Sequence, residues 1–186
     1  MIYCSDGISW IKAQPDACVD LVLTDPPYDL PVVTQQGLLS HFRRISRHGA
    51  IVFAQPERPW PLPDQHGFWI KPISTKNTSR RYSRFVELIQ VYACDVWNAD
   101  RHWSQYTNVF MDLVDGDTDH PYEKPTTLIR RLILNHTSPG MTILDPFMGS
   151  GTIGVVAEVL GRGFIGLEQS PSIFNRAQMR IMGGLS

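Results

Sequence analysis

The eight residues from Asp145 to Thr152, Asp-Pro-Phe-Met-Gly-Ser-Gly-Thr, restrict the possible folds of this chain more than any other segment. An apolar run, Met141–Asp145, ends where they begin, and a helical pattern, Gly151–Leu160, starts where they end. A second apolar run at Gly163–Glu168 leads into another helical pattern at Pro171–Met182. Strands that alternate with helices indicate an α/β protein with a mostly parallel sheet.

The same alternation runs through the rest of the chain. The sequence predicts strands at three further apolar runs, Ile2–Cys4, Val19–Thr24 and Ala50–Ala54, and a fourth strand at Phe85–Cys94. Helices are predicted at about Asp6–Ala13, Gly37–Arg47 and Pro125–Asn135. Continuous apolar strands are typical of a doubly wound sheet with helices on both faces. No repeat or shift in composition marks a second domain, so we expect one domain over residues 1–186.

Gly149 and Gly151 lie at the turn between a predicted strand and a predicted helix. Glycine lets the backbone approach a ligand closely, and the free amides of the helix favour an anionic group. Glu168 ends the following strand, a position from which a carboxylate can bind ribose hydroxyls. A Gly-x-Gly pair alone is weak, but together with the strand, Asp-Pro-Phe and the acid it predicts a site for a nucleotide-like cofactor.

A second motif, Asp25-Pro26-Pro27-Tyr28, follows the predicted strand Val19–Thr24. Its prolines end the strand and stiffen the turn. Asp25 supplies a carboxylate and Pro26 a carbonyl, so the turn presents preorganised hydrogen-bond acceptors. Taken alone, this motif is as often a rigid turn as a functional site; beside the cofactor loop, we interpret it as catalytic.

Both motifs resemble those of S-adenosyl-L-methionine-dependent amino-methyltransferases. Residues 120–125, His-Pro-Tyr-Glu-Lys-Pro, resemble the His-Pro-Thr-Gln-Lys-Pro segment of the permuted, β-group DNA methyltransferases, and the motif order is that of this group. Residues 68–71, Phe-Trp-Ile-Lys, and 84–87, Arg-Phe-Val-Glu, also match its middle section. The resemblance covers nearly the whole chain and implies a Rossmann-like methyltransferase fold. Tyr122 and Glu123 depart from the group's Thr-Gln, which leaves their roles open.

The resemblance implies S-adenosyl-L-methionine as the cofactor. Glu168 would bind its ribose, and Asp6 would accept from its adenine amine, although Asp6 could equally cap a helix. Lys124 would lie near the cofactor, with a solvated residue at a helix start as the alternative. The remaining cofactor-binding residues that the resemblance implies are Asp25, His120, Asp145, Pro146, Phe147, Met148, Gly149, Ser150, Gly151 and Thr152.

By the same resemblance, the chain methylates an exocyclic amine of a base in double-stranded DNA. Such an amine is a poor nucleophile, so the expected catalytic residues, Asp25, Pro26, Pro27 and Tyr28, would grip its hydrogens and stack a flipped-out base. Asp rather than Ser at position 25 favours N6 of adenine, with N4 of cytosine as the alternative. Methylation at C5 of cytosine is disfavoured because no cysteine follows a proline.

Two further alternatives remain. RNA and protein-glutamine methyltransferases use related motifs, but they place the cofactor loop before the catalytic motif, opposite to this chain. The chain could also be a non-catalytic DNA-binding subunit or one that needs a partner for recognition. The intact Asp25, Tyr28, Gly149 and Gly151 favour a working enzyme.

The net charge of −1 hides a basic stretch between residues 71 and 84 that contains no acid. A local basic stretch can neutralise phosphates, although such a run alone is more often a solvated loop. Residues 71–119 would be a variable DNA-facing segment between a catalytic half, about 1–95, and a cofactor half, about 120–186, and so short a segment favours a relaxed recognition sequence. The expected DNA-binding residues are Lys71, Lys76, Arg80, Arg81, Arg84 and Arg101.

The remaining sequence features bear on location and assembly. No apolar run approaches the roughly 18 residues of a membrane span, and the N-terminus does not resemble a signal peptide. The cysteines are three and scattered, and no Cys/His group has zinc-ligand spacing. We therefore expect a cytoplasmic, metal-free protein. The absence of a recognisable nuclease domain suggests a solitary enzyme of phage or prophage origin, and the sequence does not distinguish a monomer from a homodimer.

Overall fold

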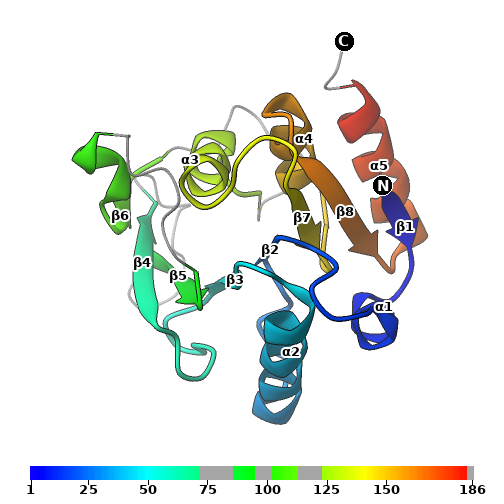
Figure 1. Ribbon diagram of the computed structural model, residues 1–186, viewed down its shortest axis with the longest axis horizontal. Coiled ribbons are helices and arrows are strands. Elements are labelled where there is room, and N and C mark those ends of the chain that lie inside the picture. Colours follow the sequence, from blue (N-terminus) through cyan, green and yellow to red (C-terminus); the bar gives the residue numbers. More distant parts are fainter. Residues whose placement is uncertain (72–85, 95–101, 113–122, 184–186) are drawn as a thin grey trace, which may run out of the picture.

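The structure, a computed structural model, describes residues 1–71, 86–94, 102–112 and 123–183 (Figure 1). Its centre is an eight-stranded sheet with the strand order β1-β8-β7-β2-β3-β5-β4-β6. The strands are β1 (Ile2–Cys4), β2 (Leu21–Thr24), β3 (Ala50–Ala54), β4 (Gln65–Ile70), β5 (Val86–Tyr92), β6 (Val109–Phe110), β7 (Thr142–Asp145) and β8 (Gly163–Glu168). The sheet includes strands from both the N-terminal and the C-terminal part of the chain.

The sheet is parallel over the five strands from β1 to β3 in this order. β5 runs antiparallel to both of its neighbours, β3 and β4, and β6 pairs parallel with β4. The prediction of a mostly parallel α/β sheet is thus confirmed. The sequence predicted the strand that corresponds to β5, but not its antiparallel direction, because periodicity reports burial and not strand direction.

Helices cover both faces of the sheet (Figure 1). α1 (Gly7–Ala13) and α2 (Val32–Ile45) lie on one face, whereas α3 (Thr126–His136), α4 (Thr152–Val159) and α5 (Pro171–Gly183) lie on the other. A short 3-10 helix, Trp103–Tyr106, packs near α3. This arrangement is the Rossmann-like, doubly wound fold that the sequence predicted.

Alternate residues of the central strands face the two helical layers. Leu21 and Leu23 belong to the core cluster on the side of α3, α4 and α5, whereas Val22 belongs to the cluster on the side of α1 and α2. In the same way, β3 directs Phe53 to the first cluster and Val52 to the second. This alternation buries apolar side chains against both helical layers. Each fully buried aliphatic or aromatic side chain contributes about 1.5–3 kcal/mol to the free energy of folding.

The helix α2 begins at Val32, whereas the sequence predicted a start near Gly37. Val32 and Val33 are exposed, so the first turn carries no apolar face that periodicity could detect. Pro31 stands at the N-cap and presets the entry into the helix. The helix therefore starts soon after the Asp-Pro-Pro-Tyr turn.

The strand order reverses direction between β7 and β2. From β2 the chain continues through α2 to β3, and from β7 it continues through α4 to β8 on the opposite side. In open α/β sheets, ligands bind outside the carboxyl ends of the strands at such a switch point. The two motifs follow β2 and β7, so the fold brings them together at this edge.

Candidate active site

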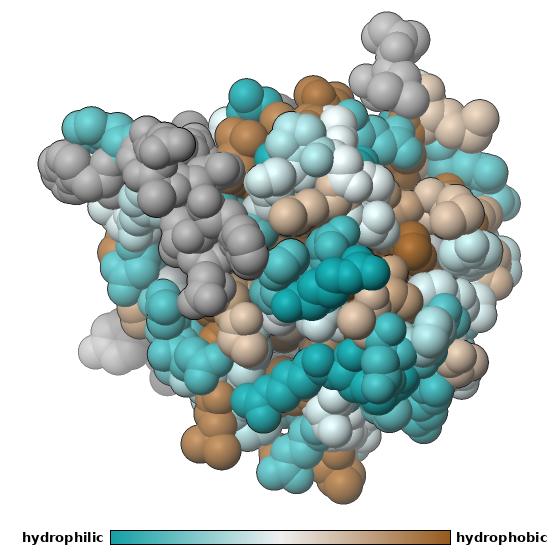
Figure 2. Space-filling view, in the orientation of Figure 1, coloured by the Kyte–Doolittle hydropathy of each residue, from teal (hydrophilic) through white to brown (hydrophobic). Residues whose placement is uncertain are grey.

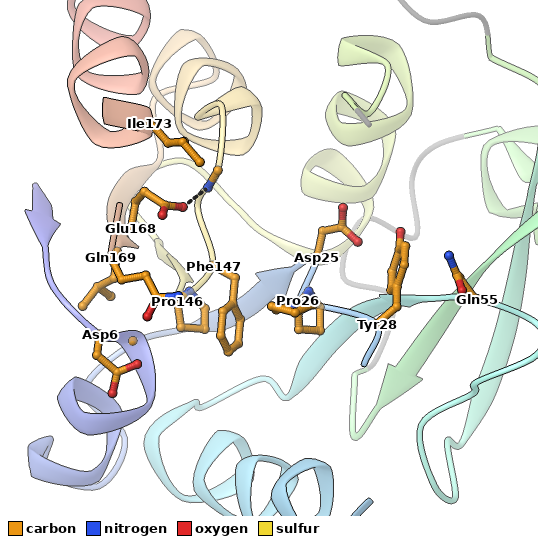
Figure 3. Close-up of a pocket in the computed structure, with 14 residues that line it drawn as sticks. Asp6, Asp25, Pro26, Tyr28, Gln55, Pro146, Phe147, Glu168, Gln169 and Ile173 are labelled. Atoms are coloured by element: carbon orange, nitrogen blue, oxygen red, sulfur yellow. Dashed lines mark hydrogen bonds between the residues drawn. The ribbon is translucent and has the colours of Figure 1, made fainter. Parts of the chain in front are cut away.

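A cavity of about 430 Å³ opens at the carboxyl ends of the parallel strands. Its volume lies within the range of roughly 300–1,000 Å³ that is typical of small-molecule sites. Asp6 and Glu168 lie toward one end, and Asp25 and Tyr28 toward the other (Figure 3). The full lining is Asp6, Gly7, Asp25, Pro26, Pro27, Tyr28, Gln55, Pro146, Phe147, Gly149, Leu167, Glu168, Gln169 and Ile173.

The two oxygens of the Asp25 carboxylate have different surroundings. Oδ2 accepts a hydrogen bond from Lys124 Nζ at 2.5 Å. Oδ1 is buried and has no hydrogen-bond partner among the residues that the structure describes. A buried acceptor without a partner is costly unless a ligand satisfies it. Asp25 thus lines the cavity, and one of its carboxylate oxygens has no hydrogen-bond donor among the described residues.

Lys124 is buried, with 6% of its side chain exposed, so the alternative of a solvated residue is wrong. Besides Asp25, Nζ meets Glu87 Oε2 at 3.0 Å and Tyr28 Oη at 3.3 Å. Burial alone lowers the pKa of Lys124, but the carboxylates of Asp25 and Glu87 raise it above its ordinary value. Lys124 therefore stays an ammonium group beside the catalytic motif.

Glu87 completes this cluster from the central strand β5. It pairs with Lys71 through Oε1 and accepts from the Tyr28 hydroxyl at Oε2, 3.3 Å away. Burial raises the pKa of Glu87, yet the ammonium groups of Lys124 and Lys71 hold it below its ordinary value. Burial, together with the charge of Asp25, raises the pKa of Tyr28, so this phenol stays protonated. The sequence did not single out Glu87 as a site residue.

Three aromatic rings surround the Lys124 ammonium group. Nζ lies 5.2 Å from the centroid of Phe53 and 5.9 Å from those of Tyr28 and Trp69. Each ring attracts the cation through its quadrupole. These rings pack around Lys124, whose side chain is 6% exposed.

The cofactor loop is positioned by its glycines and by Glu168. Gly149 and Gly151 have φ of +52° and +81°, in the region that favours glycine. The Gly149 amide donates to Glu168 Oε2 at 3.2 Å, and the Ser170 amide donates to Oε1 at 2.8 Å. Glu168 thus fixes the loop while it lines the cavity.

Three of the eight loop residues line the cavity: Pro146, Phe147 and Gly149. Met148 points instead into the core, against Gly166. Ser150 and Thr152 face the Arg180 guanidinium, which also pairs with Glu123. This contact gives Glu123, left open by the sequence, a structural place beside the start of α4.

Asp145 lies at the end of β7, fully buried and away from the cavity lining. It accepts from the Thr24 hydroxyl at 2.7 Å and from the Phe147 amide at 3.1 Å. Burial raises the pKa of Asp145 to about 7, although these two hydrogen bonds act in the opposite direction. Asp145 shapes the loop from behind.

Asp6 combines the two roles that the sequence left open. Its Oδ2 accepts from the Ser9 amide at 2.9 Å and so caps α1, and its side chain also lines the cavity. The hydrogen bond to Ser9 lowers the pKa of Asp6 below its ordinary value. Gly7 follows at the start of α1, where a Cβ would lie 2.1 Å from the Pro146 carbonyl oxygen.

The expected DNA-binding residues fall mostly outside the described residues. Lys71 is described, and it pairs with Glu87 while its ammonium lies 4.9 Å from the Trp69 ring. Gln55, Gln169 and Ile173 line the cavity without a sequence signal to mark them, because a single residue after a strand carries no recognisable pattern. Returning to the residues that the sequence predicted for the site, six lie outside the described ranges: Lys76, Arg80, Arg81, Arg84, Arg101 and His120.

Hydrophilic and hydrophobic residues are mixed over the described part of the face that Figure 2 shows. None of the described helices combines the length and apolarity that a bilayer crossing requires. Within the same residues, no group of three or more His, Cys, Asp or Glu side chains could hold a metal ion. The polar side chains of the cavity are three carboxylates, two side-chain amides and one phenol: Asp6, Asp25, Glu168, Gln55, Gln169 and Tyr28.

Comparison with known proteins supplies the context of this site. A family model described as DNA methylase matches residues 60–179. The type II methyltransferase M2.DpnII of Streptococcus pneumoniae is 50% identical over 62 residues, which are 33% of this chain and 23% of that relative. The chain thus matches about a quarter of the length of this curated relative.

Two solved structures share the fold over nearly the whole chain. The M1.HpyAVI–SAM complex superposes with a TM-score of 0.77 at 28% identity, covering 97% of this chain and 98% of that chain. The PvuII DNA methyltransferase, described as cytosine-N4-specific, also gives a TM-score of 0.77, at 17% identity, covering 96% of this chain and 85% of that chain. At such low identity the second likeness concerns the fold alone.

Proposed function

Because this chain belongs to the DNA methylase family, we propose that it transfers a methyl group from S-adenosyl-L-methionine to N6 of adenine in double-stranded DNA. The observation that carries this proposal is Asp25, a cavity-lining residue whose carboxylate oxygen Oδ1 is buried and lacks a partner among the described residues. An acceptor in this state suits an amine hydrogen of the target base.

The residues of the cavity fit the cofactor. When bound, S-adenosylmethionine, the ligand of the solved M1.HpyAVI complex, supplies a sulfonium methyl group that an amine can attack directly. The carboxylates of Asp6 and Glu168 offer acceptors for an amine and for ribose hydroxyls, and Phe147 and Ile173 offer apolar surface for a purine. Gly149 exposes backbone at the loop. Polar groups at few points of an otherwise apolar wall are typical of cofactor sites.

The catalytic motif activates and holds the base. Asp25 Oδ1 and the Pro26 carbonyl would accept the two amine hydrogens, which turns the nitrogen lone pair toward the methyl group. The prolines at 26 and 27 stiffen the turn, so the acceptors need little reorganisation. Tyr28 would stack on a base that has been flipped out of the duplex. Its ring lines the cavity while its hydroxyl is held by Lys124 and Glu87.

Adenine is the proposed target because position 25 carries Asp, whereas the N4-cytosine enzymes of the β group usually carry Ser there. N4 of cytosine remains the second candidate. The fold is compatible with either amine, because PvuII DNA methyltransferase, described as cytosine-N4-specific, shares it. Both amines need the same acceptors, so the two reactions share one mechanism.

We further propose that residues 1–186 form one β-group domain and that residues 71–119 face the DNA. The basic side chains of this segment would contact phosphates in a manner independent of sequence. A segment this short leaves few side chains to read base edges in the major groove, so we expect a short or relaxed recognition site. Methylation mapping on plasmid DNA tests this; a strict site of about six base pairs, long enough to need several bidentate base contacts, would overturn it.

The direct test of the proposed function uses methyl-labelled S-adenosylmethionine and unmethylated duplex DNA, followed by nucleoside analysis. Label in N6-methyldeoxyadenosine is the expected result. Label in N4-methylcytosine would keep the mechanism and replace the base. The absence of label from the DNA, with the cofactor bound, would contradict DNA methylation by this chain.

A further inference from the structure

Four charged side chains form a closed group next to the catalytic motif: Asp25, Glu87, Lys71 and Lys124. Two carboxylates face two ammonium groups, so their formal charges cancel. The side chains of Lys124 and Glu87 are 6% and 9% exposed. The transfer mechanism described above assigns a direct role to Asp25 and leaves the role of Glu87 unassigned.

Stability alone does not account for such a group. Taking charges out of water costs about as much as their attraction returns, and apolar replacements of buried ion pairs are often neutral or stabilising. Here the surroundings of Lys124 are already aromatic, with Phe53 and Trp69 against it. Buried charges retained beside a cavity are more typical of functional sites.

Lys124, Tyr28 and Glu87 each contact the other two through their polar side-chain atoms. An ammonium group has three donors, and Nζ meets Asp25 Oδ2, Glu87 Oε2 and Tyr28 Oη at 2.5, 3.0 and 3.3 Å. The Tyr28 hydroxyl accepts from Lys124 and donates to Glu87. All of these donors are thereby directed away from Asp25 Oδ1, which stays without a partner in the described structure.

We propose that Glu87 is a positioning residue for base methylation: it engages the Lys124 ammonium and the Tyr28 hydroxyl so that neither occupies Asp25 Oδ1. This role rests on the proposed function, since Oδ1 is the acceptor for the amine of the base. When the charge of Glu87 is removed, Asp25 is the one carboxylate of this group that still attracts Lys124, and a donor of Lys124 or Tyr28 can turn to Oδ1. It then competes with the base amine for the same oxygen, while the cofactor end of the cavity is untouched.

The first test compares three full-length variants. Glu87→Gln keeps the size and removes the charge, Glu87→Asp keeps the charge, and Glu158→Gln on α4 makes the same chemical change outside the cavity lining. With cofactor and DNA saturating, Glu87→Gln should lose about 100-fold in single-turnover rate, the size expected for a lost transition-state contact. Its cofactor Kd should stay within about threefold, and Glu87→Asp should recover part of the rate. A wild-type rate in Glu87→Gln would overturn the proposal.

The second test is a thermal-unfolding cycle with Lys124→Met, which needs no methyl acceptor. Each single variant leaves one uncompensated charge in the group, whereas the double variant leaves Asp25 with Lys71 and restores neutrality. We expect the double variant to unfold at a higher temperature than the sum of the two single losses allows. Additive losses would overturn the coupling of Glu87 to Lys124. A wild-type chain that labels no nucleic acid would instead overturn the proposed function, so the two failures are distinguishable.

Discussion

The Thr24 hydroxyl donates a hydrogen bond of 2.7 Å to Asp145 Oδ1. These residues end β2 and β7, the neighbouring strands that carry the catalytic motif and the cofactor loop. The bond is buried and joins two segments that are far apart in the sequence. It fixes the separation of the two motifs, on which the proposed methyl transfer depends.

Stability should depend on pH through Asp145, whose pKa burial raises to about 7. A carboxyl with a raised pKa in the folded state stabilises the fold fully below its unfolded pKa, about 4, and loses this contribution as the pH rises through 7. Asp145→Asn keeps an oxygen that can accept from Thr24 and Phe147 but carries no charge. The stability of Asp145→Asn relative to wild type should therefore rise between about pH 4 and 7, by an amount on the order of a few kcal/mol.

Urea unfolding of both proteins across this range measures that difference, and other titrating groups cancel in it. A flat difference would mean that Asp145 is already ionised in the folded protein at low pH. Above about pH 7.5 the difference should be constant, because Asp145 is then ionised in both states.

Gly7→Ala should weaken cofactor binding. A Cβ at this position would lie 2.1 Å from the Pro146 carbonyl oxygen, so α1 or the cofactor loop must move. Since both line the cavity, we expect the cofactor Kd to rise at least about tenfold, roughly 1.4 kcal/mol, as measured by isothermal titration. Gly37→Ala on α2, where nothing lies within 4 Å, is the matched control and should stabilise the helix by about 0.5–1 kcal/mol. Equal cofactor affinities in all three proteins would contradict the close packing of α1 on the loop.

The sequence was sufficient for most of the parallel sheet and for both motifs. Buried runs such as Ala50–Ala54 are apolar without interruption, so the residues of the strand themselves predict burial on both faces of the sheet. The direction of β5 could not be read in this way, because it depends on the path of the chain before Val86 and not on the side chains of the strand. The first turn of α2 was also missed, because Val32 and Val33 are exposed and do not continue the apolar face of the helix.

The candidate site was predicted where a motif carried it and missed where distant residues meet. Asp25, Tyr28, Glu168 and Asp6 were expected at the cavity, and all four line it. The sequence could not mark Glu87 as a site residue, because its place in the site depends on contacts with Lys124 and Tyr28, which are distant in the sequence. Burial of Lys124 was equally invisible, since a lysine before a helix is ordinarily solvated and only tertiary contacts decide otherwise.

Asp6 offers a way to separate helix capping from cofactor recognition. Asparagine is as good an N-cap as aspartate, so Asp6→Asn should unfold near the wild-type temperature. Its one oxygen would be engaged by the Ser9 amide, which leaves an NH₂ donor facing a cofactor amine, and cofactor affinity should fall about tenfold, the cost of one mismatched hydrogen bond. Asp6→Ala should lose about 1 kcal/mol of stability in addition. Wild-type affinity in Asp6→Asn would exclude Asp6 from cofactor recognition.

Charge reversal at Arg80 and Arg81 tests the proposed DNA-facing segment. Replacing both arginines with glutamate should weaken binding to duplex DNA uniformly across sequences and flatten its dependence on salt, because fewer phosphates are neutralised. Arg130→Glu with Arg176→Glu, two exposed positions on α3 and α5, makes the same change in net charge elsewhere. An unchanged salt slope in the Arg80 and Arg81 variant would move the DNA site away from residues 71–119.

Single-turnover methyl transfer by Asp25→Ala, measured beside its cofactor affinity, tests the central claim most directly. The variant removes the carboxylate of a cavity-lining residue whose buried oxygen Oδ1 has no hydrogen-bond partner among the described residues. Since that contact forms in the transition state, cofactor binding should persist while the rate of transfer to DNA falls by about three orders of magnitude or more. A rate near that of wild type, with cofactor bound, would contradict the assignment of the chemistry to Asp25.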